Sequence, residues 1–154
     1  MNKEPATTAF EYALSENGNH FVFVLIVILV LCAGFIAITF LQSGLDKVFN
    51  YKENLGWIGE QFAKTFLRNT IKLFLPVIMI GELLAGSICV YGMVELILNA
   101  KILPLIYGFA IAGIVLLLLL FGQRVSKQYA GAVSLTGYFM IVIVGLFAAA
   151  FFQF

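Results

Sequence analysis

The chain has 154 residues, of which 62% are hydrophobic and only 11% are charged. An average soluble domain is about half apolar and about a quarter charged, and a water-soluble fold of this size could not bury the excess. The formal net charge of +1 gives no field that would gather nucleic acid. Two cysteines and one histidine exclude a disulfide framework and a multi-histidine metal or haem site built by this chain alone. The composition predicts a small integral membrane protein whose main partner is the lipid bilayer.

Four apolar blocks have about the 20 residues that a helix needs to cross roughly 30 Å of hydrocarbon. They cover residues 21–41, 73–98, 102–122 and 132–152. Each block is continuous rather than alternating, which indicates helices and not the strands of a barrel. The predicted fold class is therefore all-α, with residues 21–154 forming an antiparallel four-helix bundle in the membrane.

A polar segment, residues 1–20, precedes the first block. Thr8 and Glu11 have the spacing of a capping box, which predicts a short helix over residues 8–14. The first block is longer than the apolar region of a signal peptide, and no small-residue cleavage motif follows it. We therefore expect residues 21–41 to be retained as a membrane span.

The segment between the first two blocks is too apolar for a flexible linker. Leu55, Ile58, Phe62 and Phe66 recur at helical spacing, with charged residues on the other faces. This pattern predicts an amphipathic helix over about residues 54–70, lying in the cytoplasmic interface. A cytosolic helix packed on the ends of the bundle is an equally good interpretation.

The distribution of Lys and Arg predicts the orientation of the chain. Seven basic residues lie between the first and second blocks or between the third and fourth: Lys47, Lys52, Lys64, Arg68, Lys72, Arg124 and Lys127. The opposite side has only Lys3 and Lys101. The positive-inside rule then places the basic loops in the cytoplasm. We expect a multi-pass protein of the bacterial inner membrane with both termini in the periplasm.

Three segments resemble one family in their order and spacing. The first block ends in Gly-Leu-Asp-Lys at residues 44–47, and the second contains Gly-Glu-Leu-Leu-Ala-Gly at residues 81–86. The segment before the last block, residues 121–132, reads Phe-Gly-Gln-Arg-Val-Ser-Lys-Gln-Tyr-Ala-Gly-Ala. Over roughly residues 25–150, the chain resembles DoxX-type proteins, in particular their Bacteroidetes-type members.

The resemblance implies that the chain is a membrane subunit, and it does not imply a defined reaction. The family takes its name from the small membrane subunit of a thiosulfate:quinone oxidoreductase, and some relatives join membrane-associated oxidoreductase complexes. Most members have no established activity. The resemblance therefore implies a non-catalytic accessory subunit, associated with other membrane subunits and linked to redox or quinone chemistry. Quinone is the one cofactor candidate that it adds.

Glu82 is the most unusual residue of the apolar blocks, because it lies only about 5–6 Å from the middle of its span at 1.5 Å rise per residue. An acidic group at this depth is costly, and it normally faces the bundle interior or water and has a partner. One interpretation is a proton-handling group or a contact for a quinone headgroup. The other is a structural carboxyl that fixes the helix register.

A second set of polar residues shares the predicted cytoplasmic side. Asp46 is expected to pair with Arg124, or with Lys47 in a network at the helix ends, and such a network would orient the helices. The sharper alternative is a headgroup site for quinone or lipid, built from Arg124, Gln42, Asp46 and Tyr129. Together with Glu82, these four residues are the candidates for a ligand-linked or proton-linked site.

The two cysteines, Cys32 and Cys89, are not spaced as a Cys-x-x-Cys pair, so we expect buried thiols without redox chemistry. Without such a motif the isolated chain is not expected to be an enzyme. Two further functions stay open besides the accessory subunit. One is a small transporter or cargo-binding protein that uses Glu82, although the two halves lack the similarity of inverted repeats. The other is a structural scaffold without a ligand.

Overall fold

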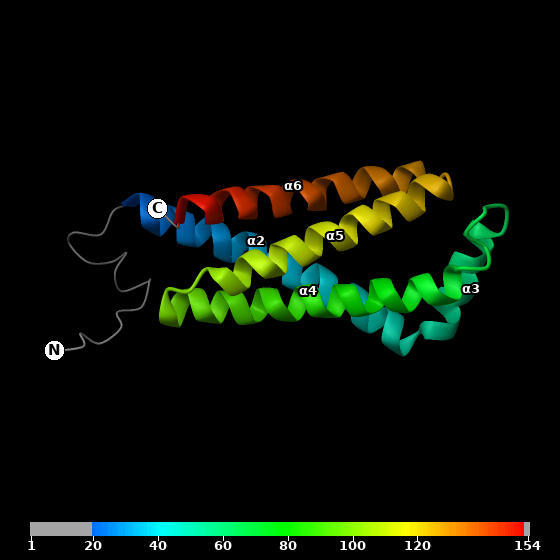
Figure 1. Cartoon of the computed structure of the whole chain (residues 1–154), viewed down its shortest axis with the longest axis horizontal. Coiled ribbons are helices and arrows are strands. Elements are labelled where there is room, and N and C mark those ends of the chain that lie inside the picture. Colours follow the sequence, from blue (N-terminus) through cyan, green and yellow to red (C-terminus); the bar gives the residue numbers. More distant parts are fainter. Residues whose placement is uncertain (1–19, 153–154) are drawn as a thin grey trace.

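The computed structural model describes residues 20–152, and the short helix predicted over residues 8–14 lies outside them. The described residues contain five helices and no strand (Figure 1). The helices are α2 (His20–Phe49), α3 (Tyr51–Phe62), α4 (Ile71–Asn99), α5 (Leu103–Val125) and α6 (Tyr129–Phe152). The predicted all-α fold class is confirmed.

Four of these helices, α2, α4, α5 and α6, are long and apolar enough to cross a membrane. The 23 residues of α5 span about 35 Å at 1.5 Å per residue, which is close to the hydrocarbon thickness. Large apolar side chains point outward along them, among them Ile38, which is 70% exposed, and Val133, which is 72% exposed. Such surfaces suit lipid and not water, so the chain is a multi-pass membrane protein.

The four long helices form a ring in which α2 packs on α4, α4 on α5, α5 on α6, and α6 again on α2. Neighbours in the ring run in opposite directions (Figure 1). We call one end of the bundle the α3 end; it contains α3, the start of α4 and the turn between α5 and α6. The far end contains His20, Phe152 and the turn between α4 and α5.

Small residues allow the helix backbones to approach closely in the core. A Cβ atom added at Gly92 on α4 would lie 2.7 Å from the backbone nitrogen of Leu105 on α5. One added at Gly108 would lie 2.8 Å from the Cys89 Sγ atom and 3.1 Å from its backbone nitrogen. Close contacts of this kind supply much of the packing energy between helices in lipid, where burial gives no hydrophobic driving force.

The helix between the first two spans is shorter than the predicted range of 54–70, because α3 ends at Phe62. Residues 63–70 form turns instead. The Thr65 hydroxyl donates a hydrogen bond to the Phe62 carbonyl at 2.9 Å, which is the local competition that makes threonine a weak helix former. Phe66, predicted on the apolar face, lies beyond the helix and is 77% exposed.

Candidate functional site

The more buried of the two ion pairs within residues 20–152 joins α2 to α4. The Lys47 Nζ atom lies 2.8 Å from Glu82 Oε2 and 3.0 Å from Glu82 Oε1. Ser43, one helical turn before Lys47, accepts a hydrogen bond from Lys47 Nζ at 2.6 Å and donates one to Glu82 Oε1 at 3.1 Å. The side chains of Lys47 and Glu82 are 14% and 3% exposed. These three residues form what we call the Lys47–Ser43–Glu82 cluster.

Glycines on each side of the cluster bring α2 and α4 together. A Cβ atom at Gly44 would lie 2.8 Å from Leu83 Cδ2. A Cβ atom at Gly86 would lie 2.7 Å from Leu41 Cγ. A larger residue at either position would push against the Leu83 or Leu41 side chain, so the glycines favour the close approach that keeps the Glu82 carboxylate within reach of α2.

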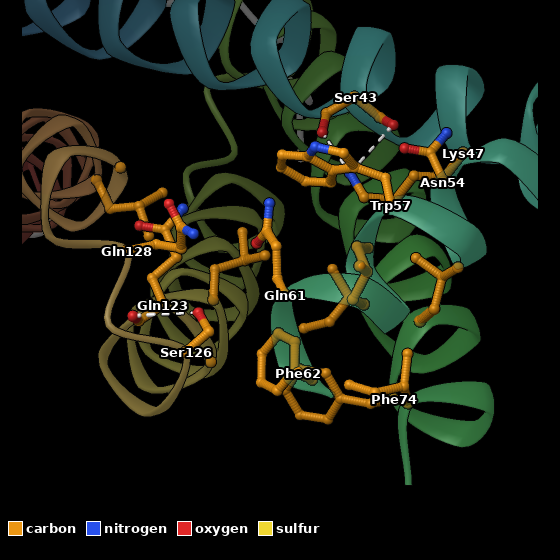
Figure 2. A pocket seen from close by; sticks show the side chains of 18 of the residues that line it. Ser43, Lys47, Asn54, Trp57, Gln61, Phe62, Phe74, Gln123, Ser126 and Gln128 are labelled. Carbon is orange, nitrogen blue, oxygen red and sulfur yellow. Dashed lines mark hydrogen bonds between the residues drawn. The ribbon is translucent and has the colours of Figure 1, made fainter. Parts of the chain in front are cut away.

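The cluster lies on the wall of a cavity of about 490 Å³ at the α3 end, lined by all five helices (Figure 2). A cavity of this size is typical of small-molecule sites, which combine apolar walls with a few polar groups. The apolar lining consists of Trp57, Ile58, Phe62, Ile71, Phe74, Leu75, Ile78, Leu119 and Leu135. The polar lining consists of Ser43, Lys47, Asn54, Gln61, Glu82, Gln123, Ser126 and Gln128. We call this space the α3-end cavity.

Gln123 on α5 adds an amide group to the wall opposite Ser43 and Lys47 (Figure 2). Its side-chain Oε1 atom is buried and accepts no hydrogen bond from the described residues. A Cβ atom at Gly131 on α6 would lie 2.8–3.0 Å from the Gln123 amide atoms, so this glycine makes room for the amide. A buried polar atom without a partner costs about 1–3 kcal/mol, and a bound molecule that hydrogen-bonds to the amide would recover part of it.

The structure places only one of the five sequence-predicted candidates, Glu82, in the α3-end cavity. Gln42, Asp46, Arg124 and Tyr129 are exposed and do not line it. They therefore do not form a common headgroup site with the cavity, although all four lie toward the same end of the bundle.

Within residues 20–152, Asp46 forms no ion pair with Arg124 or Lys47, the two candidates named for it from the sequence. The Asp46 carboxylate accepts a hydrogen bond from Asn50 Nδ2 at 2.8 Å on its own side of α2, and the Arg124 guanidinium lies 5.7 Å from the ring centre of Tyr129. One residue advances a helix by about 100°. Lys47 therefore faces α4, while Asp46 next to it faces away.

Sequence reasoning missed the partner of Glu82 and the role of Ser43. A signal was present, since a carboxyl in an apolar span needs a partner, and Ser43 and Lys47 share a helix face one turn apart. Gln123 gave no signal of its own, because its burial depends on how α5 packs against α6.

No group of three or more His, Cys, Asp or Glu side chains that could hold a metal ion occurs within residues 20–152. Cys32 and Cys89 are free thiols, and Cys89 is buried. What the α3-end cavity offers chemically is one cation, one anion, and several amide and hydroxyl groups beside an apolar wall. This combination suits binding of an amphiphilic molecule.

No family model matches the chain, and neither a curated protein nor a solved structure matches it. The similarity to DoxX-type proteins therefore depends on the three sequence segments alone and stays a prediction.

Proposed function

We propose that this protein is a non-catalytic membrane subunit that binds an amphiphilic molecule of the quinone class in the α3-end cavity. One observation carries the proposal: the buried Lys47–Glu82 pair lines an open and mostly apolar cavity. A pair that only fixed the helix register would need no such space beside it. Ionisable groups within membrane spans are costly, and they are commonly kept for function.

The two parts of a quinone match the two kinds of lining. Its ring carries carbonyl acceptors, and the donors available to them are the Lys47 ammonium and the amides of Gln61 and Gln123. Its apolar tail and ring faces would contact side chains such as Phe62 and Phe74, which lie together at one edge of the cavity (Figure 2). Ligand sites typically use this division, in which apolar contact supplies affinity and a few polar groups set the orientation.

The alternative of a cation transporter that uses Glu82 is less well supported. Both carboxylate oxygens of Glu82 already accept hydrogen bonds from Lys47. A transported cation would have to displace an ammonium group that the chain holds permanently nearby. The scaffold alternative differs from the proposal in that it expects no ligand in the α3-end cavity.

Binding can be followed through Trp57, the single tryptophan of the chain, which lines the α3-end cavity. A short-chain benzoquinone added to the purified protein in micelles should quench Trp57 fluorescence with a saturable curve. The double variant Lys47→Gln/Glu82→Gln keeps the side-chain lengths nearly unchanged and removes both charges. We expect it to bind the quinone at least about tenfold more weakly, equivalent to about 1.4 kcal/mol.

A matched control exists at the far end, where Lys101 and Glu95 form the second ion pair at 3.7 Å. The double variant Lys101→Gln/Glu95→Gln should bind the quinone as the unmodified protein does. Quenching that never saturates, or equal affinity in the two double variants, would reject the proposed site and favour the scaffold.

We also infer that the subunit works within a larger oxidoreductase complex of the bacterial inner membrane. The support is the resemblance to DoxX-type proteins and the excess of Lys and Arg at the α3 end, which favours a cytoplasmic location for that end. Copurification from native membranes should bring oxidoreductase subunits with the chain. A cysteine at position 52 should resist a membrane-impermeant thiol reagent in intact cells, and rapid labelling there would reverse the orientation.

A further inference from the structure

A second hollow, of about 540 Å³, lies at the α3 end between the turns that follow α3 and the turn that joins α5 to α6. These two segments meet at the same end of the bundle (Figure 1). Its sides include Lys64, Thr65 and Phe66 from the first segment and Val125, Ser126 and Lys127 from the second. We call this hollow the basic groove; none of the cluster residues Ser43, Lys47 and Glu82 lines it.

The two lysines of the basic groove are free to bind an anion. Lys64 and Lys127 are exposed, and neither forms an ion pair with any residue in 20–152. Glu60 is the one acid that lines the groove, so the cations outnumber the acids there. Seven of the eight Lys and Arg residues in the described part of the chain lie at this end, which adds a longer-range attraction for anions.

The backbone at Lys127 gives a second, independent reason to look for a role of its side chain. Lys127 has a φ of +60°, and the hydrogen bond from Gln128 N to Gln123 O at 2.8 Å closes the end of α5 around it. Helices commonly end with glycine in this left-handed conformation, since glycine has no Cβ to clash. The turn itself therefore does not call for a lysine.

The Phe66 ring beside the two lysines favours an amphiphile over a small anion as the ligand of the basic groove. Its ring is 77% exposed, at the end of four helices that cross the membrane. Exposed Phe side chains of interfacial segments bury into the boundary between headgroups and acyl chains. A cation pair and an exposed ring in one groove thus match a molecule with an anionic head and apolar chains.

We propose that the basic groove binds the phosphate headgroup of an anionic phospholipid. Lys64 and Lys127 contact the phosphate from the two sides of the groove, and Phe66 packs against the start of the acyl chains. Basic pockets at the ends of membrane helices hold anionic lipids in this way, by short-range charge attraction at the headgroup level. This site does not depend on the quinone proposal, because the two hollows use different charged groups.

The test compares two lipids with identical chains, dioleoyl phosphatidylglycerol and dioleoyl phosphatidylcholine, titrated into the full-length protein in micelles and counted by native mass spectrometry. We expect tighter retention of phosphatidylglycerol. Each of Lys64→Gln and Lys127→Gln should weaken it by about fivefold. Glu60→Gln should act in the opposite direction and strengthen it, because it removes a like charge from the groove.

Lys52→Gln is the matched control, because Lys52 is exposed on α3 at the same end but does not line the groove; it should retain the lipid. Lys127→Gly keeps the turn conformation accessible, so it should lose lipid without losing thermal stability. Equal retention of the two lipids, or an unchanged affinity in the Lys64→Gln/Lys127→Gln double variant, would overturn the proposal. Competition by inorganic phosphate at the same concentration as the lipid would show a site for free phosphate and would overturn the assignment to lipid.

Discussion

Among residues 20–152, the two ends of the bundle each contain one Lys–Glu ion pair, but the surroundings of the two pairs differ. At the α3 end, Lys47 and Glu82 are 2.8 Å apart, with side chains 14% and 3% exposed. At the far end, Lys101 and Glu95 are 3.7 Å apart, with side chains 68% and 14% exposed, so the difference in burial lies mainly with the lysine. Exposed pairs contribute little because water screens them, whereas removal of one partner from a buried pair leaves an uncompensated charge. Because both pairs join a lysine to a glutamate, a comparison of the two shows how burial changes the contribution of an ion pair to stability.

The connections between the helices explain why the α3 end has room for a cavity. At the far end a short turn joins α4 to α5, and Gly92 keeps the two helices in contact close to that turn. At the α3 end a whole helix and residues 63–70 stand between α2 and α4. There the α5–α6 pair lies apart from α2 and α4 (Figure 1), and the α3-end cavity lies among them. The longer connection leaves the space that a ligand would fill.

The largest effect is expected from Lys47→Met, which removes one partner of the buried pair. Glu82 then lacks its counter-charge, and the free energy of unfolding should fall by about 3 kcal/mol. The double variant Lys47→Met/Glu82→Leu removes the second charge as well and should recover most of that loss. Unfolding by SDS in mixed micelles measures both. A double variant no more stable than Lys47→Met would show that the pair does not act through its charges.

A smaller loss is expected from Gly92→Ala near the far end. The new Cβ atom would lie 2.7 Å from Leu105 N and 2.8 Å from its Cα, and backbone atoms cannot move aside as a flexible side chain can. The overpacking should lower the free energy of unfolding by about 2 kcal/mol. Gly137→Ala is the control, since nothing lies within 4 Å of its added Cβ. If Gly137→Ala destabilised the protein equally, close packing at Gly92 would not be the reason.

The spans could be predicted from the sequence because their cause is composition, and lipid accepts only long apolar helices. Glu82 stood out for the same reason, as a carboxyl in an apolar block. Its partner did not, because Lys47 lies 35 positions earlier and the pairing depends on the register between α2 and α4. That register follows from contacts such as Gly44 against Leu83, which no local pattern reveals.

The predicted headgroup site shows that the sequence also did not reveal which of two neighbouring side chains faces the interior of the bundle. Asp46 and Lys47 are neighbours in the sequence, yet only Lys47 faces the α3-end cavity. The cavity itself arises from the separation between α5 and α4 at one end, and so depends on packing along the whole length of the helices. The helix α3 is also shorter than predicted: the apolar spacing continues to Phe66, but the helix ends at Phe62, whose carbonyl accepts a hydrogen bond from the Thr65 hydroxyl.

A modest gain is expected from Ala100→Gly in the turn between α4 and α5. Ala100 has a φ of 54°, and this left-handed conformation costs a residue with a Cβ roughly 1 kcal/mol relative to glycine. The substitution should raise the free energy of unfolding by about that amount. Ala110→Gly, within α5, should instead destabilise the protein, because glycine weakens a helix interior. Equal losses in the two variants would mean that the turn is not strained at Ala100.

The smallest effect is expected from Lys101→Gln, the far-end counterpart of a charge removal at Lys47. The lysine side chain is mostly in solvent, so water already compensates for its charge, and salt screens what attraction remains. The Glu95 carboxylate keeps the hydrogen bonds from Tyr91 and Asn99, both at 3.0 Å, and the backbone hydrogen bond from Lys101 N to Glu95 O does not involve the substituted side chain. The unfolding midpoint should therefore stay unchanged at low and at high salt, whereas Lys47→Gln should lower it under both conditions. If Lys101→Gln lowered the midpoint as much as Lys47→Gln did, burial would not be what separates the two ends.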